Sequence, residues 1–205
     1  MNLSRIAPFT IALALAIAPG CGGTSPTAPS TSLRSEVLDV VGDAVTNPTY
    51  PQLTNPPDLV RATVDVGAGN ITFAVRLAPG TFDSQATVVL IDLDTDQNAM
   101  TGHARDGLGV DYTVSMGPPG FGNPPLGNQF HVLRFGAPPG PFGIVGRGPV
   151  SVMADGMNAT VPLTLLSNDD GRLNFRVHSA TVLTTISAIP FDVMPDVSFS
   201  VAVVQ

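Results

Sequence analysis

The chain has 205 residues, of which 43% are hydrophobic and only 12% are charged. Its 16 acidic residues stand against nine basic ones, which gives a net charge of −7 and argues against nucleic-acid binding through a basic patch. The 21 glycines and 20 prolines indicate a hydrophobic core crossed by many turns. That composition is typical of an all-β protein.

The chain begins with a segment that has the pattern of an export signal. Arg5 supplies a positive charge, and residues 6–18 form an alanine-rich apolar run too short to span a bilayer. The segment Ala18-Pro19-Gly20-Cys21 follows, and it contains the only cysteine of the chain. This resembles a bacterial lipoprotein signal, in which the cysteine is lipidated and becomes the mature N-terminus. The resemblance implies a signal peptide at residues 1–20 and lipidation at Cys21.

An ordinary signal-peptidase cut after Ala18 is the alternative, but Pro19 directly after the cut is unfavourable. Residues 21–35 contain mostly Gly, Ser, Thr and Pro, which predicts a flexible tether. By resemblance to Gram-negative lipoproteins, Gly22 after the cysteine favours the outer membrane, on its periplasmic side or at the cell surface. We therefore expect an exported, lipid-anchored protein of the cell envelope that meets the membrane through its N-terminal lipid only.

Residues 36–205 predict one antiparallel β-sandwich domain of about eight to ten strands. The clearest pair is Leu59–Val66 and Ile71–Leu77, two alternating segments joined by a Gly-rich turn. Residues 136–148 are predicted to be a loop, and Pro162 is expected to open a single helical turn. No cysteine follows Cys21, so a bound metal is a plausible additional source of stability. The other predicted strands are 36–41, 87–93, 110–116, 129–135, 150–154, 159–166, 173–178 and 197–204.

An acidic loop follows the apolar strand predicted at residues 87–93. Oxygen-bearing side chains occur there at every second position: Asp92, Asp94, Asp96 and Asn98. Carboxylates this close repel one another unless a cation lies among them, and Ca²⁺ suits loops that offer many oxygens. The sequence therefore predicts a calcium site in a strand-to-strand connection.

This loop is not an EF-hand. Counted from Asp92, the turn glycine of that motif is replaced by Gln97 and its bidentate Glu by His103. The alternative to a metal site is a solvated acidic turn supported by hydrogen bonds from its own backbone.

Several short motifs resemble exported β-sandwich domains of the DOMON-like and family 9 carbohydrate-binding-module-like group. They are Gly42-Asp43, Pro57-Asp58-Leu59, Ile71-Thr72-Phe73, the segment 91–102, Gly109-Val110-Asp111-Tyr112 and the segment 191–196 with the sequence FDVMPD. In that group the acidic strand-end loop resembles a structural calcium site, which supports the loop residues as ligands. Asp111 is expected to complete the shell, with Asp192 and Asp196 as alternatives.

Members of that group bind sugars or haem, and this chain departs from both. It has no Trp and only two Tyr, whereas sugar platforms use exposed aromatic faces. Haem needs an axial ligand, and the histidines and methionines here lie in no recognisable motif. The candidates would be His131, His178, Met116 and Met153.

No catalytic motif is present: the chain has no G-x-S-x-G elbow, no HExxH and no phosphate-binding loop. The sequence therefore favours a non-catalytic envelope module with a structural calcium site, which acts in surface binding or interaction, with a glycan or an envelope protein as partner. A carbohydrate-binding module for glycan or cell-wall sugar is the alternative. A metal-dependent hydrolase is the third reading, and it would need an open metal position and a general base.

Overall fold

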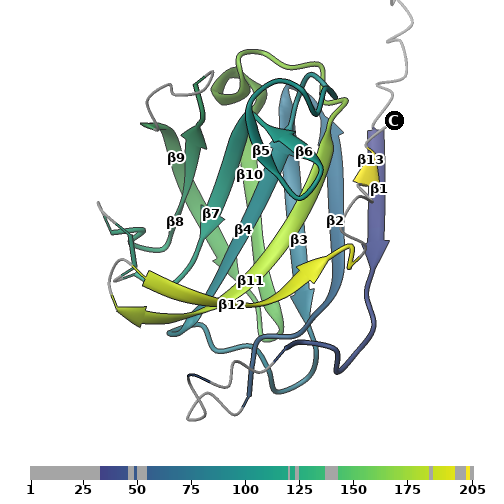
Figure 1. Ribbon diagram of the computed structural model, residues 1–205. Helices are drawn as coiled ribbons and strands as arrows, with labels where there is room; N and C mark the ends of the chain where they lie inside the picture. Colours follow the sequence, from purple (N-terminus) through teal and green to yellow (C-terminus); the bar gives the residue numbers. More distant parts are fainter. Residues whose placement is uncertain are drawn as a thin grey trace, which may run out of the picture.

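The computed structural model describes residues 33–45, 49, 55–119, 121–122, 125–136, 143–184, 187–196 and 202–203. Its main sheet has the order β1-β2-β3-β10-β9-β8-β7-β4-β11-β12, with β13 paired to β11, and every strand pairing is antiparallel. The sheet curls until its two halves face each other (Figure 1). The predicted all-β, antiparallel fold class is therefore confirmed. The strands are β1 (Leu33–Leu38), β2 (Leu59–Gly67), β3 (Asn70–Leu77), β4 (Thr87–Asp94), β5 (His103–Arg105), β6 (Leu108–Val110), β7 (Tyr112–Met116), β8 (Gln129–Arg134), β9 (Gly143–Val152), β10 (Gly156–Pro162), β11 (Asn174–Thr184), β12 (Ser187–Met194) and β13 (Ala202–Val203).

The β2–β3 hairpin forms as its alternating sequence predicts. Gly67 pairs with Asn70, and the two residues between them, Ala68 and Gly69, have φ of 49° and 76°. Positive φ at both central positions is the geometry of the tight turn that suits the twist of a hairpin. Alternate residues of β3 are buried, so one face of the hairpin packs on the core.

The core lies between the two halves of the curled sheet. Phe73 comes from one half, whereas Phe130 and Phe175 come from the other, and all three side chains are fully buried. Burial of an aromatic side chain of this size contributes about 1.5–3 kcal/mol. The hydrophobic contact between the halves therefore stabilises the curl.

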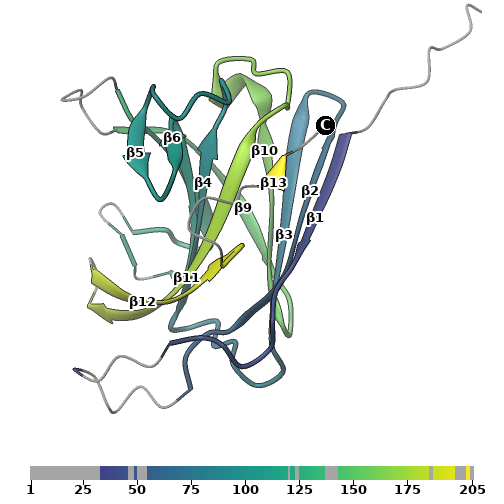
Figure 2. The same cartoon turned by 45° about the vertical axis from the view of Figure 1, so that its right-hand side comes forward.

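Strand β4 is buried on both faces. Val89, Ile91 and Leu93 point into the core, and the alternate residues Asp92 and Asp94 point outwards but are buried as well. The reason is the separate β5–β6 hairpin, which lies over the outer face of β4 (Figure 2). The hairpin thus converts an exposed sheet face into a covered one.

Strand β9 corrects the sequence-based prediction of a loop at residues 136–148. The strand begins at Gly143, pairs with β8 through its first part and with β10 through its second, and so leads the sheet from one half to the other. Its glycines are needed for packing: a Cβ at Gly146 would lie 2.5 Å from Leu165, and one at Gly148 would lie 2.4 Å from the Phe130 ring. Glycine here allows large side chains to approach the strand and does not mark a turn.

Other boundaries also differ from the prediction. Strand β1 begins at Leu33 rather than Glu36, and β11 extends to Thr184, whereas the sequence predicted a strand that ends at His178. The predicted helical turn is confirmed as a 3₁₀ turn at Leu163–Leu166. Strand β12 was not predicted.

The predicted signal peptide, Cys21 and most of the tether lie outside the described residues. Within the described part of the chain, no helix has the length and apolar character needed to span a membrane.

Candidate functional site

The acidic loop that follows β4 brings three of the predicted ligands together. Asp94 ends β4, Asp96 lies in the loop, and Asp111 lies between β6 and β7. One carboxylate oxygen of each lies within 4.8 Å of the others. Asp111 is held in place by its own backbone N–H, which donates to the carbonyl oxygen of Leu93 at 2.8 Å.

Hydrogen bonds within the loop orient these carboxylates. The Asn98 N–H donates to Oδ1 of Asp94 at 2.9 Å and to Oδ1 of Asp96 at 3.0 Å. The N–H and hydroxyl of Thr95 both donate to Oδ2 of Asp111, at 3.0 and 2.9 Å. The loop therefore presents its three carboxylates in a fixed arrangement.

The carboxylates of this group are not paired with a basic side chain in the described part of the chain. No salt bridge within the described residues includes Asp94, Asp96 or Asp111. Burial raises the pKa of Asp94 above its usual value, and the adjacent Asp96 carboxylate raises it further, against hydrogen bonds from Asn174 and Asn98 that lower it. A positive ion at this position would favour the ionised form of Asp94.

Asn98 has a different role from the three carboxylates. Its side-chain oxygen accepts the N–H of Met100 at 3.1 Å, and only its backbone N–H contacts Asp94 and Asp96. The side chain of Asn98 therefore supports the turn.

Asp92 lies in a separate network beneath the β5–β6 hairpin. Its carboxylate is 0% exposed, forms a salt bridge with Arg105 at 2.9 Å, lies 3.2 Å from Nε2 of His178, and accepts the Thr113 hydroxyl at 2.5 Å. Burial alone would raise the pKa of Asp92, but His178, Arg105 and Thr113 together hold it below its usual value. Asp92 is thus an ionised, internally paired carboxylate that fixes the hairpin to the sheet.

The loop is packed tightly against β6 through two glycines. A Cβ at Gly109 would lie 2.3 Å from the carbonyl oxygen of Thr101 and 2.4 Å from that of Asn98. A Cβ at Gly102, where φ is +63°, would lie 2.6 Å from the carbonyl oxygen of Val110. The position of the acidic loop therefore depends on the absence of side chains at these residues.

A groove of about 460 Å³ lies beside the acidic loop. Asp96, Asp111 and Asp169 contribute acidic groups to its wall, and Arg134 and Phe135 also line it. At its edge the exposed ring of His103 stacks on Phe135, with ring centres 5.2 Å apart and planes 12° apart. The groove combines polar groups with one aromatic pair.

The residues considered as haem ligands lie in different surroundings. Met116 is fully buried in the core, and His178 contacts Asp92. His131 is buried in β8, where burial and Arg147 lower its pKa, whereas Met153 is exposed. Packing and the Asp92 contact account for Met116 and His178.

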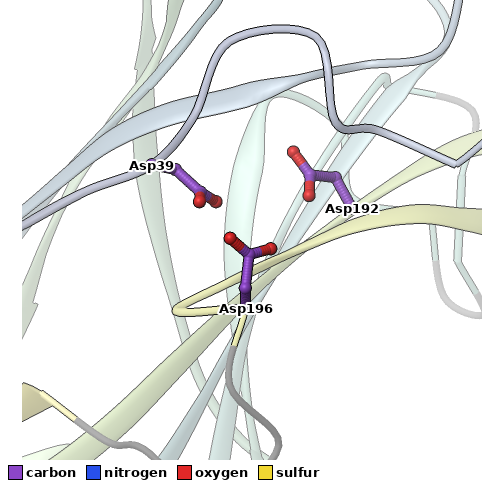
Figure 3. A group of neighbouring side chains, drawn as sticks. All are labelled: Asp39, Asp192 and Asp196. Carbon is purple, nitrogen blue, oxygen red and sulfur yellow. The ribbon is translucent and has the colours of Figure 1, made fainter.

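Sequence reasoning did not find a second acidic group. Asp192 and Asp196 lie beside Asp39 (Figure 3), and Asp192 is also grouped with Asp43 and Asp58. Neither group includes a residue of the acidic loop. The motifs Gly42-Asp43, Pro57-Asp58 and FDVMPD contain four of these five aspartates, but nothing in their spacing predicts that they meet.

Comparisons of the chain with protein-family models, with curated proteins and with solved structures gave no significant match.

Proposed function

We propose that this protein is a non-catalytic, lipid-anchored module of the cell envelope whose acidic loop binds Ca²⁺ and supports a surface for binding or interaction. The observation that carries the proposal is the convergence of Asp94, Asp96 and Asp111 at the end of β4. The export-signal pattern and Cys21 support the lipid anchor.

The chemistry of the three carboxylates suits calcium. One oxygen of each lies within 4.8 Å of the others, so a single ion among them can approach all three. Ca²⁺ accepts carboxylates together with carbonyl oxygens and water in a flexible shell, whereas Mg²⁺ demands a near-ideal octahedral one.

Calcium binding at the loop is tested by the variant Asp111→Asn of the full-length chain. Asn keeps an oxygen for the Thr95 N–H but removes one negative charge. In the wild type, calcium at about a hundred times its dissociation constant should stabilise the native state by about 2.7 kcal/mol. It should also slow hydrogen exchange of the Thr95 and Asn98 amides, which donate to the proposed ligands. In Asp111→Asn this slowing should disappear.

Asp65→Asn is the matched control, because Asp65 lies on β2 outside every acidic group of the described residues and pairs only with Arg34 at 3.5 Å. It should respond to calcium as the wild type does. Exchange at Thr95 and Asn98 that is the same with calcium and with chelator in the wild type would eliminate the loop site.

The groove beside the loop favours carbohydrate binding as a second candidate function. It joins acidic groups and Arg134 to the stacked pair His103 and Phe135, and aromatic faces with polar neighbours are suited to sugar rings. A glycan array with the calcium-loaded protein should then give signals that Phe135→Ala removes and Asp65→Asn keeps. If the protein binds no glycan on the array, carbohydrate binding is excluded and the interaction module remains as the proposed function.

A further inference from the structure

Five aspartates distant in sequence gather beside strands β1, β2 and β12. They form the overlapping groups Asp39, Asp192, Asp196 and Asp43, Asp58, Asp192, and within each group one oxygen per carboxylate lies within 4.8 Å of the others. Figure 3 shows the first group, in which the side chains point toward one another from the segment after β1 and from β12 with the residues that follow it. Asp192 is the residue that the two groups share.

Several oxygens of this group are buried without a donor. Asp58 is 4% exposed, and its Oδ2 accepts the Gly42 N–H at 2.7 Å, whereas its Oδ1 has no hydrogen-bond partner. Oδ2 of Asp39 and Oδ1 of Asp43 are also buried without a partner. Buried carboxylate oxygens are normally paired with a donor or a cation, because their desolvation is otherwise uncompensated.

These five carboxylates take part in no salt bridge between described residues. Burial and the neighbouring Asp196 raise the pKa of Asp39 to about 7. Burial, with the Asp43 and Asp58 carboxylates nearby, raises the pKa of Asp192 to about 6. Ionised carboxylates this close repel one another, and a cation among them would relieve that repulsion.

We propose that Asp43, Asp58 and Asp192 form a second calcium site, with Asp39 and Asp196 beside it, which joins the two edges of the curled sheet. The ligands are carboxylate oxygens only, which favours a hard cation over zinc or copper. One oxygen of each carboxylate in a group lies within 4.8 Å of the others, so one ion can approach all three, as at the acidic loop.

The position of the site gives the ion a structural role. Strands β1 and β12 are the first and last strands of the main sheet order, so their outer edges are not paired to each other. Hydrogen bonds between described residues already cross this junction: the Leu59 N–H donates to Asp192 at 2.5 Å, the Val45 N–H donates to the Phe191 carbonyl at 2.8 Å, and the Ser179 hydroxyl donates to the Pro57 carbonyl at 2.5 Å. A calcium ion held by Asp43 and Asp58 on one side and by Asp192 on the other would fasten this junction.

The test compares thermal unfolding of the full-length wild type and the variant Asp58→Asn, each with Ca²⁺ and with chelator. Asn keeps an acceptor for the Gly42 N–H and removes one unpaired buried charge. In chelator, Asp58→Asn should therefore unfold at the same temperature as the wild type or above it. In calcium it should unfold below the wild type, and its calcium dissociation constant at this site should rise about tenfold or more, since ligand charge sets the affinity.

Asp58→Asn should therefore lower the unfolding temperature in calcium but not in chelator. This difference separates a cation site from a purely structural carboxylate. If Asp58 serves only to accept the Gly42 N–H, its replacement changes stability equally in calcium and in chelator, and that result would overturn the proposal. Asp43→Asn provides a second variant if Asp58→Asn does not fold, and Asp65→Asn is again the matched control.

Hydrogen exchange locates the effect independently of the acidic loop. In the wild type and in Asp111→Asn, calcium should slow exchange of the Gly42 and Leu59 amides, which donate to Asp58 and Asp192. Unchanged exchange of both amides would contradict the second site while leaving the proposal for the acidic loop intact.

Discussion

Replacement of Arg105 by Met is expected to destabilise the protein by about 3 kcal/mol at pH 7, because it leaves the fully buried Asp92 carboxylate without its cation. The value lies at the lower end of the range for a broken buried pair, since the Arg105 side chain is 36% exposed and the Thr113 hydroxyl and His178 remain in contact with Asp92. The measurement is urea unfolding at constant ionic strength.

The double variant Asp92→Leu/Arg105→Met is the control for this prediction. An apolar pair of similar size should recover most of the lost stability, because no unpaired charge remains. The cost of Arg105→Met should also be the same in calcium and in chelator, because Asp92 is paired within the protein. A loss that calcium restores would mean that Asp92 is a metal ligand after all.

Replacement of Gly109 by Ala should abolish calcium binding at the acidic loop and lower stability by about 1–3 kcal/mol, the usual cost of overpacking. The added methyl group would lie 2.3 and 2.4 Å from two backbone oxygens of the loop, so the backbone must move. A displaced loop should move Asp96 away from Asp111, which lies outside the loop. The measurement is calcium titration calorimetry together with thermal unfolding in chelator.

Gly67→Ala is a suitable comparison, because a Cβ there meets no atom within 4 Å and its φ is not positive. That variant should bind calcium as the wild type does. Undiminished binding by Gly109→Ala would show that the position of the loop does not control the site.

The sequence predicted those parts of the fold that rest on local pattern. Period-two alternation placed the β2–β3 hairpin, whose turn has the positive φ angles that its Gly-rich sequence allows. It failed at β9, where Gly146 and Gly148 resemble loop punctuation but serve close packing against Leu165 and Phe130. Whether a glycine ends a strand or admits a neighbouring side chain depends on the opposite layer, which a local pattern cannot reveal.

In the candidate site, too, contacts between residues near in sequence could be predicted, whereas contacts that depend on the whole fold could not. Asp94 and Asp96 lie two residues apart, and Asp111 directly precedes β7, the strand that pairs with β4, so their meeting could be predicted from the strand order. Asp92 has the same spacing, yet it is paired with Arg105 because the β5–β6 hairpin folds back over β4. The meeting of Asp39 with Asp192 depends on the curl of the entire sheet, and no local pattern contains it.

Calcium binding is tested most directly by the amount of calcium bound by the full-length chain, measured by equilibrium dialysis at free calcium up to about 1 mM, the range of extracellular calcium modules. We expect more than one ion per wild-type chain, with separate losses in Asp111→Asn and Asp58→Asn and none in Asp65→Asn. A wild-type chain that binds no calcium over this range would contradict this expectation, and would leave the acidic loop as a solvated turn.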